Sequence, residues 1–130
     1  MDAATRDLFD AHFEQVLREM PARVHELLRE VPLIVEDYPS RELRRSLGVR
    51  RKDGLCGLYT GIPLGRRSVE HSGVPSDVVH IFRAGLLAMA SDRRGTVDAD
   101  ELRSQIRITI LHELGHYHGL NEQELEQLGY

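Results

Sequence analysis

The stretch LHELGHYHGLNE, residues 111–122, directly follows the apolar run IRITI at residues 106–110. Apolar residues recur at helical spacing up to and into this stretch, which predicts a long helix packed on a core. At about 100° per residue, His112 and His116 lie one turn apart on the same face of that helix, and Glu113 falls at the edge of that face. The sequence therefore places a cluster of titratable groups beside the core.

Two histidines four residues apart, with a glutamate after the first, form the HExxH pattern of a zinc site. Both imidazoles can reach one metal ion, and Glu113 can reach a water molecule bound to that ion. Zinc suits neutral imidazole ligands and lowers the pKa of its bound water to about 7. We therefore predict one Zn²⁺ per chain, with His112 and His116 as ligands and Glu113 as the general base.

A catalytic zinc site usually has a third protein ligand. Gly119 is placed to end the helix in a left-handed conformation, and the reversal of the chain after it can return Glu122 to the metal. We predict Glu122 as this ligand; the alternative is an acidic residue in the first turn of a last helix capped by Asn121. His118 is the rival ligand, but it lies about 200° around the helix from His116 and should point away.

Length and composition are typical of one soluble globular domain, with 130 residues, 41% hydrophobic and 29% charged. We expect residues 1–130 to form that domain. Cys56 is the only cysteine, which excludes an intrachain disulfide. The first residues lack the basic start and apolar region of a signal peptide, and no apolar run is long enough for a membrane span. These features predict a cytoplasmic protein that does not act at a membrane.

Charge is unevenly distributed along the chain. The net charge of −4 argues against nucleic-acid binding. The stretch RELRRSLGVRRK, residues 41–52, nevertheless holds five arginines and a lysine against one glutamate. Such a stretch is most often a solvated surface, and binding of an acidic partner is the alternative. We expect a peptide or protein substrate and no nucleic acid.

Local patterns predict the remaining elements. The expected helices are residues 5–18, a second opened by Pro21, a short one from Ser40 stopped by Gly48, and the long one from a cap at Asp98 to about residue 118. The expected strands are residues 31–39, 55–64 and 78–82, the last followed by further strand or a short helix to residue 90. This order predicts an α+β or α/β layer.

The expected strand at residues 55–64 carries three features of note. Gly57 and Gly61 interrupt it, and glycine in a strand often marks a bulge or a close backbone approach. Tyr59 between them is either a packed aromatic residue, which we favour, or a group that polarises a carbonyl near the metal. Cys56 is expected to be a small core residue.

HELGHYHGLNE resembles the motif of the small bacterial zincin-like metallopeptidases, sometimes called minimal zincins. Their pattern is HExxHxxGxx followed by an acid, most often Asp. Three upstream stretches, VPLIVEDYPS, LCGLYTGIPLGRRS and VVHIFRAGLL, look like the strands of that family in the same order. The resemblance covers roughly residues 30–125.

The resemblance implies an α+β fold of the minimal zincin type, in which a small twisted mixed sheet packs against the metal-binding helix, with additional helices on the N-terminal side. It assigns His112 and His116 as zinc ligands and Glu113 as the base. Glu122 departs from the usual Asp by one methylene, which changes its reach. Peptidases of this type often bind substrate along an exposed sheet edge, and residues 55–64 are the candidate strand.

These observations predict a zinc-dependent metallopeptidase that hydrolyses peptide bonds. The alternative is a non-catalytic zinc-binding protein that acts through a partner. Glu113 favours catalysis, because a structural zinc site has no need of a base. A metal-dependent ribonuclease is a third class, and Glu113, Glu122 and the acidic net charge all point away from it.

Overall fold

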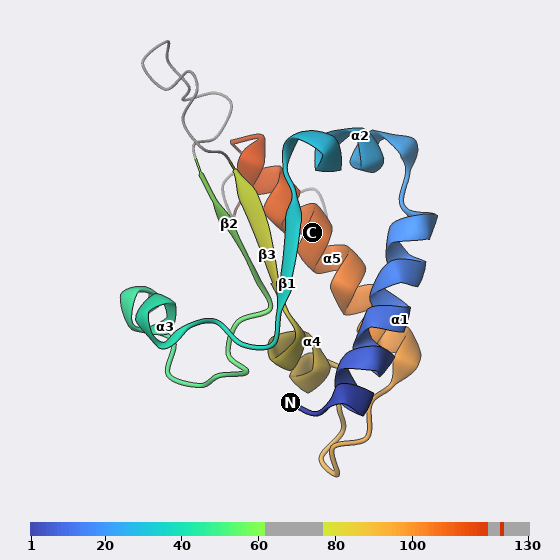
Figure 1. The fold of residues 1–130 in the computed structure, drawn as a ribbon, viewed down its shortest axis with the longest axis vertical. Helices are drawn as coiled ribbons and strands as arrows, with labels where there is room; N and C mark the ends of the chain where they lie inside the picture. The colour runs from blue at the N-terminus through green and yellow to red at the C-terminus, as the bar shows by residue number, and fades with distance from the viewer. Residues whose placement is uncertain (62–76, 120–122, 124–130) are drawn as a thin grey trace.

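The structure is a computed structural model that describes residues 1–61, 77–119 and 123. Within these residues the chain forms five helices and three strands (Figure 1). In chain order they are α1 (Ala3–Glu19), α2 (Ala22–Glu30), β1 (Leu33–Glu36), α3 (Arg41–Leu47), β2 (Gly57–Thr60), β3 (Val78–Phe82), α4 (Arg83–Met89) and α5 (Ala99–Tyr117). The predicted order is confirmed, and the segment after β3 is a helix.

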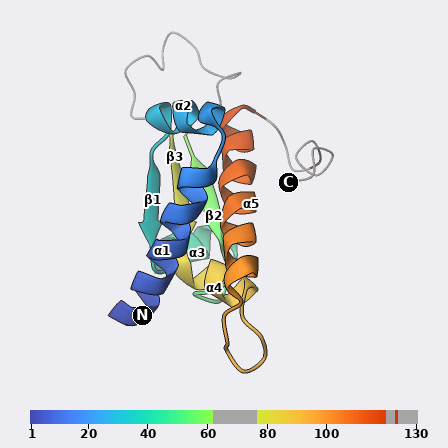
Figure 2. The ribbon, with the colours of Figure 1, turned by 90° about the vertical axis from the view of Figure 1, so that its right-hand side faces the viewer.

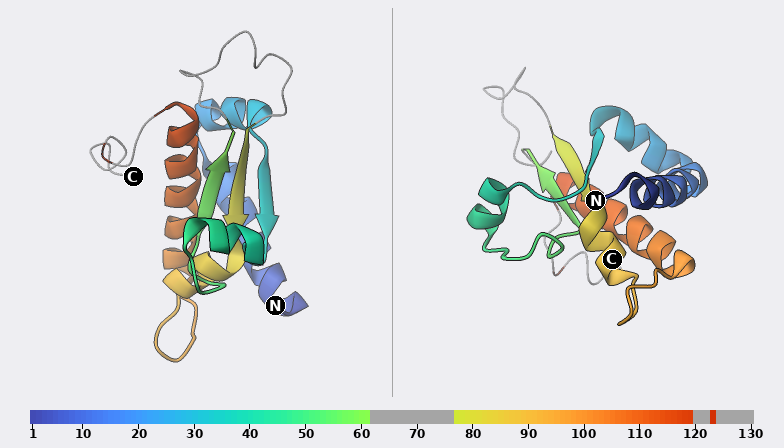
Figure 3. Two further views of the ribbon diagram at one scale, coloured as in Figure 1. Left: turned by 90° about the vertical axis from the view of Figure 1, so that its left-hand side faces the viewer. Right: turned by 60° about the horizontal axis from the view of Figure 1, so that its bottom comes forward.

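The three strands form one mixed sheet in the order β1-β3-β2. β1 runs parallel to β3, from Leu33 opposite Val79 to Glu36 opposite Phe82, whereas β2 runs antiparallel to β3 and lies at an edge of the sheet. α1 and α5 lie on one side of the sheet and α3 lies on the other (Figures 1 and 3). The expected α+β fold, a small mixed sheet packed against the long helix, is confirmed.

The core lies between the sheet and the two long helices, which run side by side in Figure 2. Its main buried side chains are Phe9, Phe13 and Val16 of α1, Val79 and Ile81 of β3, and Leu102, Ile106, Ile110 and Leu114 of α5. The α5 residues recur every four positions and so share one side of the helix. Burying each leucine or isoleucine stabilises the fold by about 1.5–3 kcal/mol. This packing fixes α5 and therefore the side chains on its other sides.

Strand pairing sets the length of β1, and capping residues set the two ends of α3. β1 is shorter than the predicted strand at residues 31–39, because it pairs with β3 only over residues 33–36. The Ser40 hydroxyl accepts a hydrogen bond from the Leu43 N–H (3.0 Å) at the start of α3, and Gly48 ends that helix at φ 72°. Residues 62–64 of the predicted second strand lie outside the described residues.

Two arginines tie α1 to the segment after β1. The Arg6 guanidinium donates to Asp37 (2.7 Å), and Arg83 donates to both Asp37 and Asp10 (3.0 Å each). Arg6, with a smaller effect of Arg83, holds the pKa of Asp37 below its ordinary value.

None of the helices in the described ranges is both long and apolar enough to cross a membrane.

Candidate metal centre

α5 carries the HExxH motif as one unbroken helix. The Asp98 carboxylate caps its start by accepting a hydrogen bond from the Glu101 N–H (3.0 Å), while the Asp98 N–H donates to the Ala90 carbonyl (2.8 Å). The helix continues to Tyr117, and Gly119 beyond it is left-handed at φ 81°. The predicted cap and the predicted glycine conformation are confirmed. Because the helix is unbroken, its backbone fixes the spacing of the side chains of the motif.

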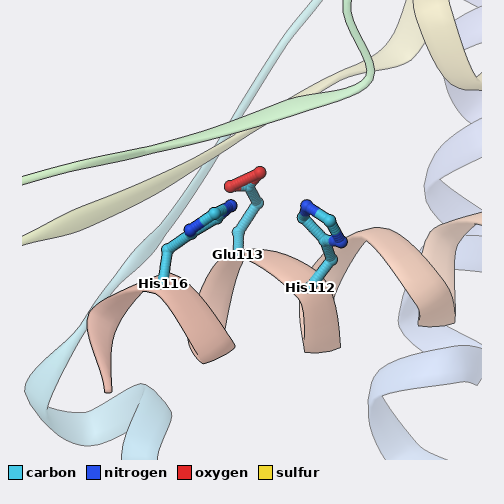
Figure 4. Close-up of side chains that lie close together, drawn as sticks. All are labelled: His112, Glu113 and His116. Atoms are coloured by element: carbon cyan, nitrogen blue, oxygen red, sulfur yellow. The ribbon is translucent and has the colours of Figure 1, made fainter. Parts of the chain in front are cut away.

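The two histidines and the glutamate come together as their spacing predicts. In His112, Glu113 and His116, one potential ligand atom from each side chain lies within 4.8 Å of the others. The histidine ring centroids are 5.0 Å apart. Figure 4 shows all three side chains projecting from the same side of α5 toward the strands. Within the described residues, no other group of three histidine, cysteine or acidic side chains is arranged to hold a metal ion.

The donor set fits a zinc ion. Two nitrogens bound to one tetrahedral zinc at about 2.0–2.1 Å lie about 3.4 Å apart. One potential ligand atom from each histidine lies within 4.8 Å of the other, which is near enough for both rings to face one ion. The histidines are half-buried and Glu113 is only 8% exposed, so the site is sheltered but accessible from one side. The chemistry and the spacing therefore suit the predicted metal.

Strand β2 lies directly against this part of α5. The Tyr59 N–H donates to Glu113 Oε2 (3.1 Å). A side chain at Gly57 would place its Cβ 2.6 Å from Thr109 Cγ2 and 3.5 Å from Glu113 Cγ. The close approach predicted for the strand glycines is therefore confirmed at Gly57, and it brings a backbone donor to the carboxylate.

Comparison with models of known protein families matches residues 28–130 to the zincin-like metallopeptidase family. The chain belongs to this family. A search of curated proteins found no match. Membership in the zincin-like metallopeptidases agrees with the mixed sheet, the long helix and the His-Glu-His cluster on it.

In this zincin-like chain, Tyr59 connects β2 to a second buried acid. The Tyr59 hydroxyl donates to Asp77 Oδ1 (2.5 Å), and Asp77 is only 4% exposed. The Tyr59 ring also lies 6.0 Å from that of Tyr117. These contacts favour the packed aromatic interpretation of Tyr59. The burial of Asp77 was not predicted from the sequence, because a single acidic residue ahead of an apolar strand gives no signal of burial.

The third ligand of the zincin-like site remains a prediction. Glu122 and Asn121 lie outside the described residues. The rival His118 is exposed after the end of α5, its ring lies 5.5 Å from that of Tyr117, and it does not join the metal-binding group. The predicted orientation of His118 away from the other histidines agrees with this position.

Proposed function

We propose that the chain is a zinc-dependent metallopeptidase, in which His112, His116 and Glu122 hold one Zn²⁺ and Glu113 is the general base. The observation that carries the proposal is the convergence of His112, Glu113 and His116 within 4.8 Å, in a chain of the zincin-like family. Glu113 distinguishes this group from a purely structural zinc site, which would need ligands but no base.

The bound ion would supply Lewis acidity toward the scissile carbonyl and acidify a water molecule. The Glu113 carboxylate accepts a proton from the attacking water and delivers it to the nitrogen of the leaving amine. The Tyr59 N–H donates to Oε2 of this carboxylate and so holds the base in one orientation before the substrate binds.

A peptide substrate has a natural place beside this centre. β2 is an edge strand, and it crosses α5 at the glutamate of the motif. An extended peptide can add to a sheet edge through main-chain hydrogen bonds. We infer that the substrate extends along β2, which would bring its scissile bond to the metal-binding side of α5.

Replacing Glu113 with glutamine tests the proposal. The carbonyl oxygen of the new side-chain amide can still accept from the Tyr59 N–H, so the fold and the metal should be retained. Hydrolysis of a peptide library should fall by about 10²–10⁴-fold, because the amide cannot take the proton. The matched control is Glu26→Gln, since His25 and Glu26 repeat the start of the motif on the exposed side of α2. Unchanged hydrolysis by the Glu113→Gln protein would refute the assigned role.

One observation favours a second candidate, a non-catalytic zinc protein that acts through a partner. The Glu113 carboxylate accepts a hydrogen bond from the backbone of β2, and in this second candidate its role is to hold that strand against α5. In that case zinc content would be the same in wild type and Glu113→Gln, with no hydrolysis by either protein. Glu113→Ala, which removes the acceptor of the Tyr59 N–H, would then destabilise the protein, whereas Glu113→Gln would not.

A further inference from the structure

The basic residues of the chain are concentrated in one segment. Residues 41–52, called the basic segment below, contain six of the seventeen basic residues and one of the twenty-one acidic residues. The segment therefore carries +5 and the remainder of the chain −9. In the described part of the chain, its only ion pair joins Arg51 to Asp53 (2.8 Å). By contrast, Arg6 and Arg83 are each paired with acids of other elements. The positive charge of the basic segment is thus largely uncompensated.

The basic segment contributes little to the hydrophobic core. No residue of α3 is buried, and Leu47 is 45% exposed. α3 stands on the side of the sheet opposite α1 and α5 (Figure 3). A helix that buries nothing contributes little to the stability of the fold, so its sequence is available for another purpose.

An apolar hollow adjoins the basic segment. It has a volume of about 540 Å³ and lies between the Arg51–Asp53 loop and α4, whose Ala84, Leu87 and Ala88 line it. Lys52 stands at the same hollow, with its ammonium 5.3 Å from the centre of the Tyr38 ring. The hollow is shallow and open, so it suits one side chain of a docked partner better than an enclosed small molecule. The hollow therefore combines an apolar wall with a rim in which Arg51 and Lys52 outnumber the single acid, Asp53.

The apolar surface continues along α4. A second hollow of about 370 Å³ shares Ala88, Arg51 and Asp53 with the first. It extends to Met89, whose exposed fraction is 57%. Exposed methionine is common at surfaces that bind varied apolar side chains. The two hollows therefore lie side by side along the exposed side of α4, next to the basic segment.

We propose that the basic segment and the exposed side of α4 form a docking surface for an acidic segment of a partner protein. An apolar side chain of the partner sits against α4, and its carboxylates face Lys52 and the arginines. A nucleic acid matches the positive charge equally well, but the −9 charge of the rest of the chain repels a long polyanion.

This docking surface is separate from the proposed catalytic site. α4 lies at the N-terminal end of α5, whereas the motif lies near its C-terminal end (Figure 2). His112 is thirteen residues from Ala99, which corresponds to roughly 20 Å along the helix. The inference therefore holds whether or not the chain proves to be a peptidase.

Fluorescence anisotropy of a labelled peptide of alternating glutamate and leucine residues tests the proposal on the full chain. We expect saturable binding that weakens as salt increases. Replacing glutamate by glutamine, or leucine by serine, should each abolish most of that binding. Arg45→Ala, Arg50→Ala and Lys52→Ala combined in one protein should weaken it roughly tenfold, because three exposed charge pairs are lost.

The matched control combines Arg18→Ala, Arg93→Ala and Arg94→Ala, which removes the same charge from exposed positions elsewhere. This protein should bind like wild type. Ala88→Glu places a repelling carboxylate in the hollow at an exposed position and should also abolish binding, whereas Ala88→Gln should not. Equal losses in the control, no binding at all, or tighter binding of a single-stranded oligonucleotide would each overturn the proposal.

Discussion

Gly57 is the point at which β2 meets the metal-binding helix, and its replacement by alanine tests how the site is built. The new Cβ would lie 2.6 Å from Thr109 Cγ2 and 3.1 Å from the His80 carbonyl oxygen. The first distance is far below an ordinary contact of about 3.5–4.0 Å between carbon atoms, and the second is also tighter than most contacts that a Cβ makes. Thr109 is β-branched and has few rotamers within a helix, and the His80 carbonyl belongs to the adjacent strand, so neither yields freely. β2 must therefore move away from α5.

The expected cost follows from this overpacking. An extra methyl group in a tightly packed site destabilises by about 1–3 kcal/mol. For a chain of this size, we expect Gly57→Ala to lower the melting temperature by roughly 5–10 °C. The bond from the Tyr59 N–H to Glu113 should lengthen at the same time, so turnover of any cleaved peptide should fall while zinc is retained.

Thr109→Ser provides the matching rescue, because it removes only the methyl group that the new Cβ meets. Combined with Gly57→Ala it should recover most of the lost stability, with a coupling of about 0.5–3 kcal/mol in a double-mutant cycle measured by thermal unfolding. The remaining contact with His80 leaves a small residual cost. Additive effects of the two changes, or a Gly57→Ala protein as stable as wild type, would refute the reasoning.

Three further changes test other contacts. Tyr59→Phe leaves the buried Asp77 carboxylate without its phenol donor and should destabilise by about 1–3 kcal/mol in chemical unfolding; an unchanged midpoint would contradict that pairing. The bond from Arg6 lowers the pKa of the Asp37 carboxyl in the folded protein. The Asp37 charge therefore stabilises the fold fully at pH values above the ordinary aspartate pKa of about 3.9. This stabilisation is lost as the pH falls through the lower pKa that Asp37 has in the folded protein. Asp37→Asn should therefore be less stable than wild type at neutral pH, and the difference should vanish in acid; a constant difference at all pH values would exclude this linkage. Burial raises the pKa of the Cys56 thiol, so the folded protein should react with a thiol reagent at about pH 8 more slowly than the unfolded chain, and equal rates would show that the thiol is exposed.

The sequence predicted best what depends on local spacing. α5, its cap at Asp98 and the convergence of His112, Glu113 and His116 all follow from helical geometry over a few turns. α3 between Ser40 and Gly48 was predicted for the same reason, since its cap and its left-handed end are local signals.

Contacts between distant parts of the chain could not be predicted in this way. Tyr59 and Glu113 are 54 positions apart, and nothing near either residue signals that a strand amide meets the carboxylate. Gly57 signalled a close approach but not its partner. Asp77 is buried because β3 places it beside the Tyr59 hydroxyl, which depends on strand pairing. Strand lengths were overestimated for a similar reason, because a strand ends where its neighbour ends.

Metal content is the most direct test of the central claim. Protein purified without a histidine tag should contain about one zinc ion per chain by elemental analysis, as expected for a single catalytic site. His112→Ala should lose that ion, and the exposed His118→Ala should keep it. No zinc in the wild-type protein even after incubation with zinc, or the same content in both variants, would contradict a metal centre at His112 and His116.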